Sequence, residues 1–257
     1  MAHRIVALAA ALAAGCGSSG SQPDARPGDA PADAHIDAAP VAMSGTVTDG
    51  QNPLAQAHVC LVGHPEVACA TTAADGTWTL VDVFPEDDVA ISYTASGYLG
   101  TVSLSSKDGA GVVWLATAPL ATDAQATQLL ATEAGFAYPD AANGFFRVHV
   151  EGVVGATVTL APAGGGGPVY TRSDGTPDPS LAATASTTSN SLVYFGNLAP
   201  GAYTLTAFAT GKACYDRPQN SPTPQPIAGD WAPSGVGTIR IAVVAGALTD
   251  DMHVYCF

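Results

Sequence analysis

The feature that most constrains the fold of this chain is a set of short segments in which apolar and polar residues alternate, and this set occurs twice. Residues 57–61 recur as 156–160, residues 78–85 as 193–200, and residues 89–97 as 203–211. Alternation with period two is typical of β-strands that bury one face. A repeat of several such segments indicates two units of one kind. The sequence therefore predicts an all-β fold made of two tandem β-sandwiches.

The alternation also predicts which side chains form the two cores. Asp75 and Gly76 lie between two alternating segments, where a tight turn needs the positive φ that glycine adopts easily. Helical character is limited to residues 123–133, between the two halves. The expected core positions are Val59, Leu61, Trp78, Leu80, Val89, Ile91 and Tyr93 in the first half and Val158, Leu160, Val193, Phe195, Tyr203 and Leu205 in the second.

Four motifs of the first half follow one another in a recognisable order. They are SGTVT at 44–48, PLAQAHVCL at 53–61, ADGTWTL at 74–80 and SGY at 96–98. This order resembles that of a carboxypeptidase regulatory-like domain. The resemblance implies a transthyretin-like (prealbumin-like) seven-stranded β-sandwich that is itself non-catalytic and usually serves as an accessory or surface module. It covers residues 43–118 and extends to residues 144–257, with residues 119–143 as a connector.

The first fifteen residues are typical of a secretory signal. Arg4 precedes an uncharged run over residues 5–14, which is too short to span a bilayer. Residues 12–16 (LAAGC) resemble a bacterial lipobox, which implies that Cys16 carries lipid and becomes the new N-terminus. The alternative is an ordinary signal peptide cut after an Ala-x-Ala-like site. We expect a lipid anchor at Cys16 and, because Gly17 rather than Asp follows it, the outer membrane, either periplasmic or surface-exposed.

Composition describes the linker and excludes one class of partner. Residues 16–42 are mainly small, polar or proline residues, which cannot bury enough apolar surface to offset the entropy of ordering. They predict a disordered stalk. The whole chain has 8 Lys and Arg against 22 Asp and Glu, a formal net charge of −14. A polyanion would be repelled, so nucleic-acid binding is excluded.

The cysteines predict two disulfides. If Cys16 carries lipid, four cysteines remain, an even number that suits an oxidising compartment. Cys60 and Cys69 lie symmetrically about a four-residue loop, so opposed positions in a hairpin would bring them within bonding reach. Cys214 follows a strand and Cys256 lies in the last strand, so a bond between them would fasten the C-terminal strand to the second sandwich.

Motifs for catalysis are absent from the sequence. It contains no Gly-x-Ser-x-Gly, no His-Glu-x-x-His and no phosphate-binding glycine loop. Related sandwiches include ring-opening hydrolases and iron dioxygenases, but their C-terminal and His-x-His motifs are missing here. We therefore expect no enzyme, no cofactor and no metal site. The histidines of the body are scattered along the chain and are expected to be surface polar residues: His58, His64, His149 and His253.

Two loops contain further candidate residues. An acidic loop could bind Ca²⁺ through Asp82, Glu86, Asp87 and Asp88, although a solvated acidic turn is the favoured interpretation. The proline-rich stretch over residues 215–233 places Tyr215 and Trp231 in a long loop, where binding residues often gather. The alternative is that Trp231 covers a sheet edge or the core.

The combined features favour a lipid-anchored envelope protein that acts as a non-catalytic spacer or binding module. Its expected partners are a membrane, reached through the anchor, and an envelope protein or polysaccharide. Two alternatives remain open: a carbohydrate-binding module of an envelope polysaccharide system, and an accessory protein of a secreted peptidase.

Overall fold

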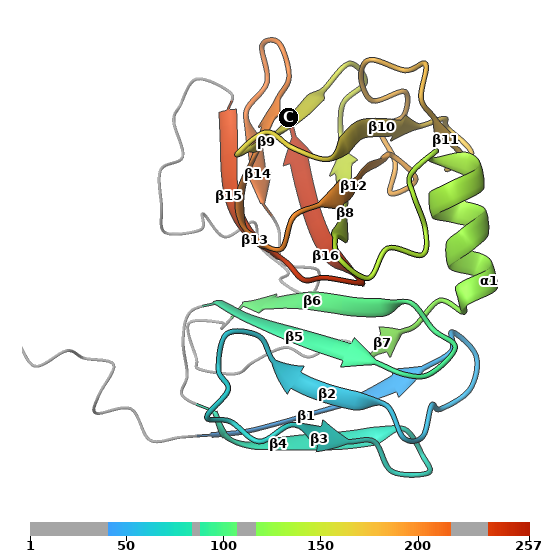
Figure 1. Cartoon of the computed structure of the whole chain (residues 1–257). Coiled ribbons are helices and arrows are strands. Elements are labelled where there is room, and N and C mark those ends of the chain that lie inside the picture. The colour runs from blue at the N-terminus through green and yellow to red at the C-terminus, as the bar shows by residue number, and fades with distance from the viewer. Residues whose placement is uncertain (1–40, 84–87, 107–116, 217–235) are drawn as a thin grey trace, which may run out of the picture. The chain divides into compact units, whose positions relative to one another are not determined.

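The computed structural model describes residues 41–83, 88–106, 117–216 and 236–257. Cys16, the signal segment and nearly all of the expected linker lie outside the described residues. Residues 38–257 form one compact unit. Within the described ranges nearly all regular elements of this unit are β-strands, as Figure 1 shows, so the all-β prediction is confirmed.

The N-terminal half contains two sheets that bury one core between them. The first has the order β4-β1-β7, with β1 antiparallel to β4 and parallel to β7. The second has the order β3-β2-β5-β6. The strands are β1 (Val41–Thr48), β2 (His58–Leu61), β3 (Ala70–Thr71), β4 (Thr77–Val83), β5 (Asp88–Thr94), β6 (Gly100–Ser106) and β7 (Ala118–Pro119).

The C-terminal half repeats this arrangement with added strands. One sheet has the order β11-β10-β12-β8-β16, with β14 also paired to β16, and the other has the order β9-β13-β15. The strands are β8 (Gly144–Glu151), β9 (Thr157–Ala161), β10 (Gly166–Thr171), β11 (Pro177–Asp178), β12 (Leu192–Leu198), β13 (Gly201–Phe208), β14 (Cys214–Asp216), β15 (Val236–Val243) and β16 (Ala247–Cys256). Strands β6 and β16 pair in parallel, so one ten-stranded sheet contains strands of both halves.

The strand register agrees with the repeat found in the sequence. Val59 pairs with Tyr93 between β2 and β5, and the corresponding Val158 pairs with Ala207 between β9 and β13. Both β4 and β12 are irregular at the same place, where Asp82 has φ 59° and Asn197 has φ 55°. Positive φ is uncommon outside glycine, and Asn and Asp tolerate it best. The two halves therefore share their pairing and a local irregularity.

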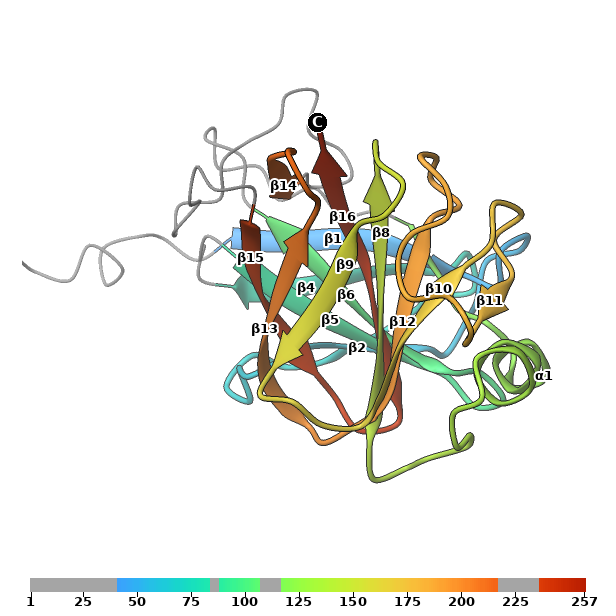
Figure 2. The same cartoon turned by 90° about the horizontal axis from the view of Figure 1, so that it is seen from above.

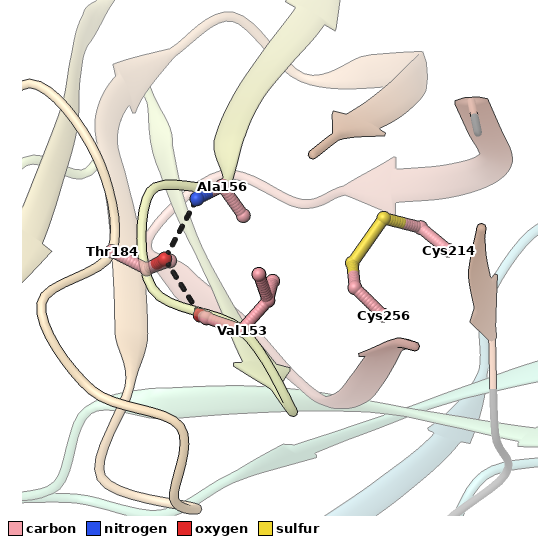
Figure 3. Close-up of a disulfide and its surroundings, with 5 residues drawn as sticks. All are labelled: Val153, Ala156, Thr184, Cys214 and Cys256. Carbon is pink, nitrogen blue, oxygen red and sulfur yellow. Dashed lines mark hydrogen bonds between the residues drawn. A yellow bond between two sulfur atoms is a disulfide. The ribbon is translucent and has the colours of Figure 1, made fainter. Parts of the chain in front are cut away.

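A buried threonine holds the chain in the same way in each half. The Thr184 hydroxyl donates to the carbonyl of Val153 at 3.0 Å and accepts from the amide of Ala156 at 2.9 Å, as Figure 3 shows. In the N-terminal half, Thr72 donates to the Leu54 carbonyl at 2.7 Å and accepts from the Ala57 amide at 2.9 Å. Each hydroxyl satisfies a backbone amide at the start of a strand, β9 or β2, where a lost hydrogen bond would be costly.

The cores contain nearly all the expected positions. Two clusters of buried side chains correspond to the two halves, and a third contains Phe136, Phe145 and Tyr194. Leu160 is only partly buried, and the side chain of Val89 lies outside the described part of the chain. The other expected positions are buried: Val59, Leu61, Trp78, Leu80, Ile91, Tyr93, Val158, Val193, Phe195, Tyr203 and Leu205.

The turn, the helix and the cysteine pairs also agree with the sequence. Gly76 has φ 76° in the turn before β4. A helical segment runs over the expected residues, as α1 (Asp123–Ala126) continued by a π-helical segment, η1 (Thr127–Glu133), and Thr122 caps its start. The structure joins Cys60 to Cys69 and Cys214 to Cys256, the two pairs expected (Figure 3 shows the second).

Candidate functional site

Strands β8 and β16 bring together polar side chains from positions about a hundred residues apart. The strands are parallel neighbours (Figure 2). His149 pairs in register with His253, and Glu151 with Tyr255. On one face of this pair, Phe146, Val148, Val150, Met252 and Val254 belong to the core of the C-terminal half. Since side chains alternate between faces, Arg147, His149, Glu151, His253 and Tyr255 lie on the opposite face. The register shifts between Thr249 and Met252, and Asp250 contacts Arg147 on this same face. We call this set the polar ladder: Arg147, His149, Glu151, Asp250, His253 and Tyr255.

The first cross-strand pair of the polar ladder is an ion pair between Arg147 and Asp250. Arg147 Nε donates to Asp250 Oδ1 at 2.8 Å, and its Nη2 donates to Oδ2. Burial opposes the positive charge, but Asp250 and Tyr194 more than offset this and raise the pKa of the guanidinium. Such a bidentate pair satisfies both groups in a partly buried setting. The Arg147 charge is therefore compensated locally.

The second cross-strand pair consists of the stacked imidazoles of His149 and His253. The rings of His149 and His253 lie 4.2 Å apart between centroids and are nearly parallel, at 6°. His253 is only 8% exposed. His149 Nδ1 lies 2.9 Å from the carbonyl oxygen of Ser189. Burial lowers the pKa of His149, and the neighbouring His253 lowers it further. The His149 ring is thus favoured in its neutral form.

The third cross-strand pair, Glu151 and Tyr255, contributes a carboxylate. Glu151 Oε1 lies 2.9 Å from His253 Nδ1 and accepts a hydrogen bond from the Tyr255 hydroxyl at 3.3 Å. One donor atom from each of His149, Glu151 and His253 falls within 4.8 Å of the others. Two imidazoles and one carboxylate are a common ligand set for transition metals.

The structure differs from the sequence expectation for two of the four histidines. His149 and His253 are adjacent and partly or fully buried, whereas His58 is exposed and His64 forms a pair with Glu66 at 2.9 Å. The sequence contains one local signal in each strand, which is a histidine at an outward position of the alternating segments FFRVHVE and MHVY. No local pattern, however, indicates that these two strands are neighbours.

The other sequence candidates are located only in part. The expectation that Tyr215 lies in a loop is wrong, because Tyr215 belongs to β14, where its backbone pairs with Tyr255 of the polar ladder strand β16. Trp231 lies outside the described residues, as do Glu86 and Asp87 of the acidic loop. Asp82 is exposed at the irregular position of β4, and Asp88 begins β5. The acidic loop, for which a solvated turn is the favoured interpretation, thus lies only partly within the described residues.

Comparison with known proteins gives only remote similarity. No family model matches the chain. No curated protein matches it either. Among solved structures, the Bacillus anthracis TIE protein aligns at 10% identity with a TM-score of 0.25, over 84% of this chain and 34% of that one. A minor pilin of the Gram-positive pathogen Streptococcus agalactiae aligns at 10% identity with a TM-score of 0.23, over 83% of this chain and 96% of that one. Among the described residues, no helix is both long and apolar enough to cross a membrane.

Proposed function

We propose that this protein is an exported, non-catalytic module of the cell envelope, attached to a membrane by a lipid on Cys16. In this proposal, residues 16–42 form a flexible stalk, and two sandwich domains, 43–118 and 144–257, act beyond it as a spacer or binding module. The outer membrane is the proposed location, and any binding function resides on residues 215–233, with Tyr215, which lies on β14, and Trp231.

The observation that carries the proposal is the pair of disulfides. Each lies within one half of the chain, Cys60 with Cys69 and Cys214 with Cys256. Structural disulfides persist in oxidising compartments and are rare in the bacterial cytosol. They account for every cysteine except Cys16, which directly follows the apolar run of the signal. Export of the chain, with Cys16 available to carry lipid, is the simplest explanation of two disulfides in the body and a fifth cysteine after the apolar run.

The test of the anchor is metabolic labelling with a palmitate analogue in a Gram-negative host. We expect the wild-type chain to be labelled and to sediment with membranes. The Cys16→Ser variant should be unlabelled and released into the soluble periplasmic fraction. Cys69→Ser is the matched control, since it removes a cysteine of the body and should leave labelling unchanged. Equal labelling of the wild type and Cys16→Ser would contradict the proposal.

A further inference from the structure

We propose that His149, His253 and Glu151 form a binding site for a divalent transition-metal ion of the zinc and copper class. The inference goes beyond the proposed envelope role and does not depend on it. All three residues belong to the polar ladder, on the described strands β8 and β16.

The geometry already gathers the ligands. One donor atom from each residue lies within 4.8 Å of the other two, and His253 Nδ1 and Glu151 Oε1 are 2.9 Å apart. Two ligands at roughly 2.1 Å from one tetrahedral ion are separated by about 3.4 Å. The lone pairs of parallel rings do not converge on one ion, so binding requires the two imidazoles to turn out of their stack and the contact between His253 Nδ1 and Glu151 to open. Rotation of side chains suffices for this, because the backbone register already places His149 opposite His253. Both strands are interior members of a hydrogen-bonded sheet, which fixes the backbone of the site.

The surrounding groups orient the ligands. A carbonyl oxygen can only accept a hydrogen bond, so the contact between His149 Nδ1 and the Ser189 carbonyl requires a proton on Nδ1. In the neutral ring Nε2 then carries the lone pair that binds a metal. Metal-binding histidines commonly hold their second nitrogen to a carbonyl or carboxylate in this way. The Tyr255 hydroxyl, 3.3 Å from Glu151 Oε1, supports the carboxylate similarly.

The charge and the donor types define the class of ion. Glu151 is the acidic member of the three, and the nearby Arg147 is paired with Asp250. Imidazole nitrogen suits zinc, copper and nickel, whereas calcium and magnesium prefer sites made of oxygen ligands. Three protein ligands leave a fourth position of a tetrahedral ion for water or an external ligand.

The test is isothermal titration of the full chain with zinc chloride, with both disulfides oxidised. The protein carries Cys16→Ser, so that a free thiol does not compete for zinc. We expect saturable binding of one ion per chain and much weaker binding of calcium. His149→Ala, His253→Ala and Glu151→Gln should each weaken zinc binding by at least about tenfold. The matched control, His58→Ala with His64→Ala, removes two histidines outside the site and should bind zinc as tightly as the parent.

A second measurement covers the case in which His253→Ala fails to fold. Copper(II) bound to the unmutated site should show coupling to two imidazole nitrogens in its electron paramagnetic resonance spectrum. The proposal is overturned if binding is not saturable at one ion per chain, if fewer than two imidazoles couple to copper, or if the control double variant loses the affinity.

Discussion

At the scale of single residues, Gly196 shows how one missing side chain allows a contact. A Cβ atom at position 196 would lie 2.3 Å from Cγ of the buried Phe136 ring, which packs against β12. In the N-terminal half the corresponding residue is Val81, whose side chain is 53% exposed to solvent. We predict that Gly196→Ala destabilises the fold by about 1–3 kcal/mol, because Phe136 must move. Urea denaturation measures this, with Gly164→Ala as control, since a Cβ there has open space. Equal stability of the two variants would refute the packing argument.

At the scale of structural elements, the two disulfides fasten different lengths of chain. Cys60 and Cys69 are 9 residues apart, whereas Cys214 and Cys256 are 42 apart and join β14 to β16. In the chain-entropy model, closing these loops stabilises the fold by roughly 2.5 and 4 kcal/mol. We predict that the Cys214→Ala, Cys256→Ala double variant loses more stability than the Cys60→Ala, Cys69→Ala one. Denaturation of both variants under identical conditions decides this, and the reverse order would mean that native-state strain or residual structure dominates.

At the scale of the whole molecule, residues 38–257 form one compact unit. Residues 17–37 of the sequence contain almost no large apolar residue. The parallel pairing of β6 with β16 also covers an edge of each strand, which removes sites for unwanted pairing. We predict that a chain beginning at Ala38 has the same melting temperature as the full Cys16→Ser chain. A clear decrease in the truncated chain would show that residues 1–37 stabilise the fold.

Much of the fold could be predicted from the sequence because its signals are local. Alternation with period two selects strands and their buried faces, as at Val158 and Leu205, both fully buried. Asp75 and Gly76 specify a turn, and Thr122 with Gln125 caps the helix within four residues. The pair Cys60 and Cys69 followed from the symmetry of a short hairpin, whereas the pair Cys214 and Cys256 followed from the even number of remaining cysteines.

The candidate site and the sheet that contains strands of both halves depended on the tertiary structure. His149 and His253 are 104 positions apart, and each alone is an ordinary outward residue of a strand. They become a stacked pair 4.2 Å apart only because β8 and β16 are parallel neighbours in register. The sequence by itself determined which residues form strands, turns and cores, since backbone preference and burial are set by nearby residues. Which strands are neighbours was decided by packing of the whole chain, because parallel pairing joins segments that share no local signal.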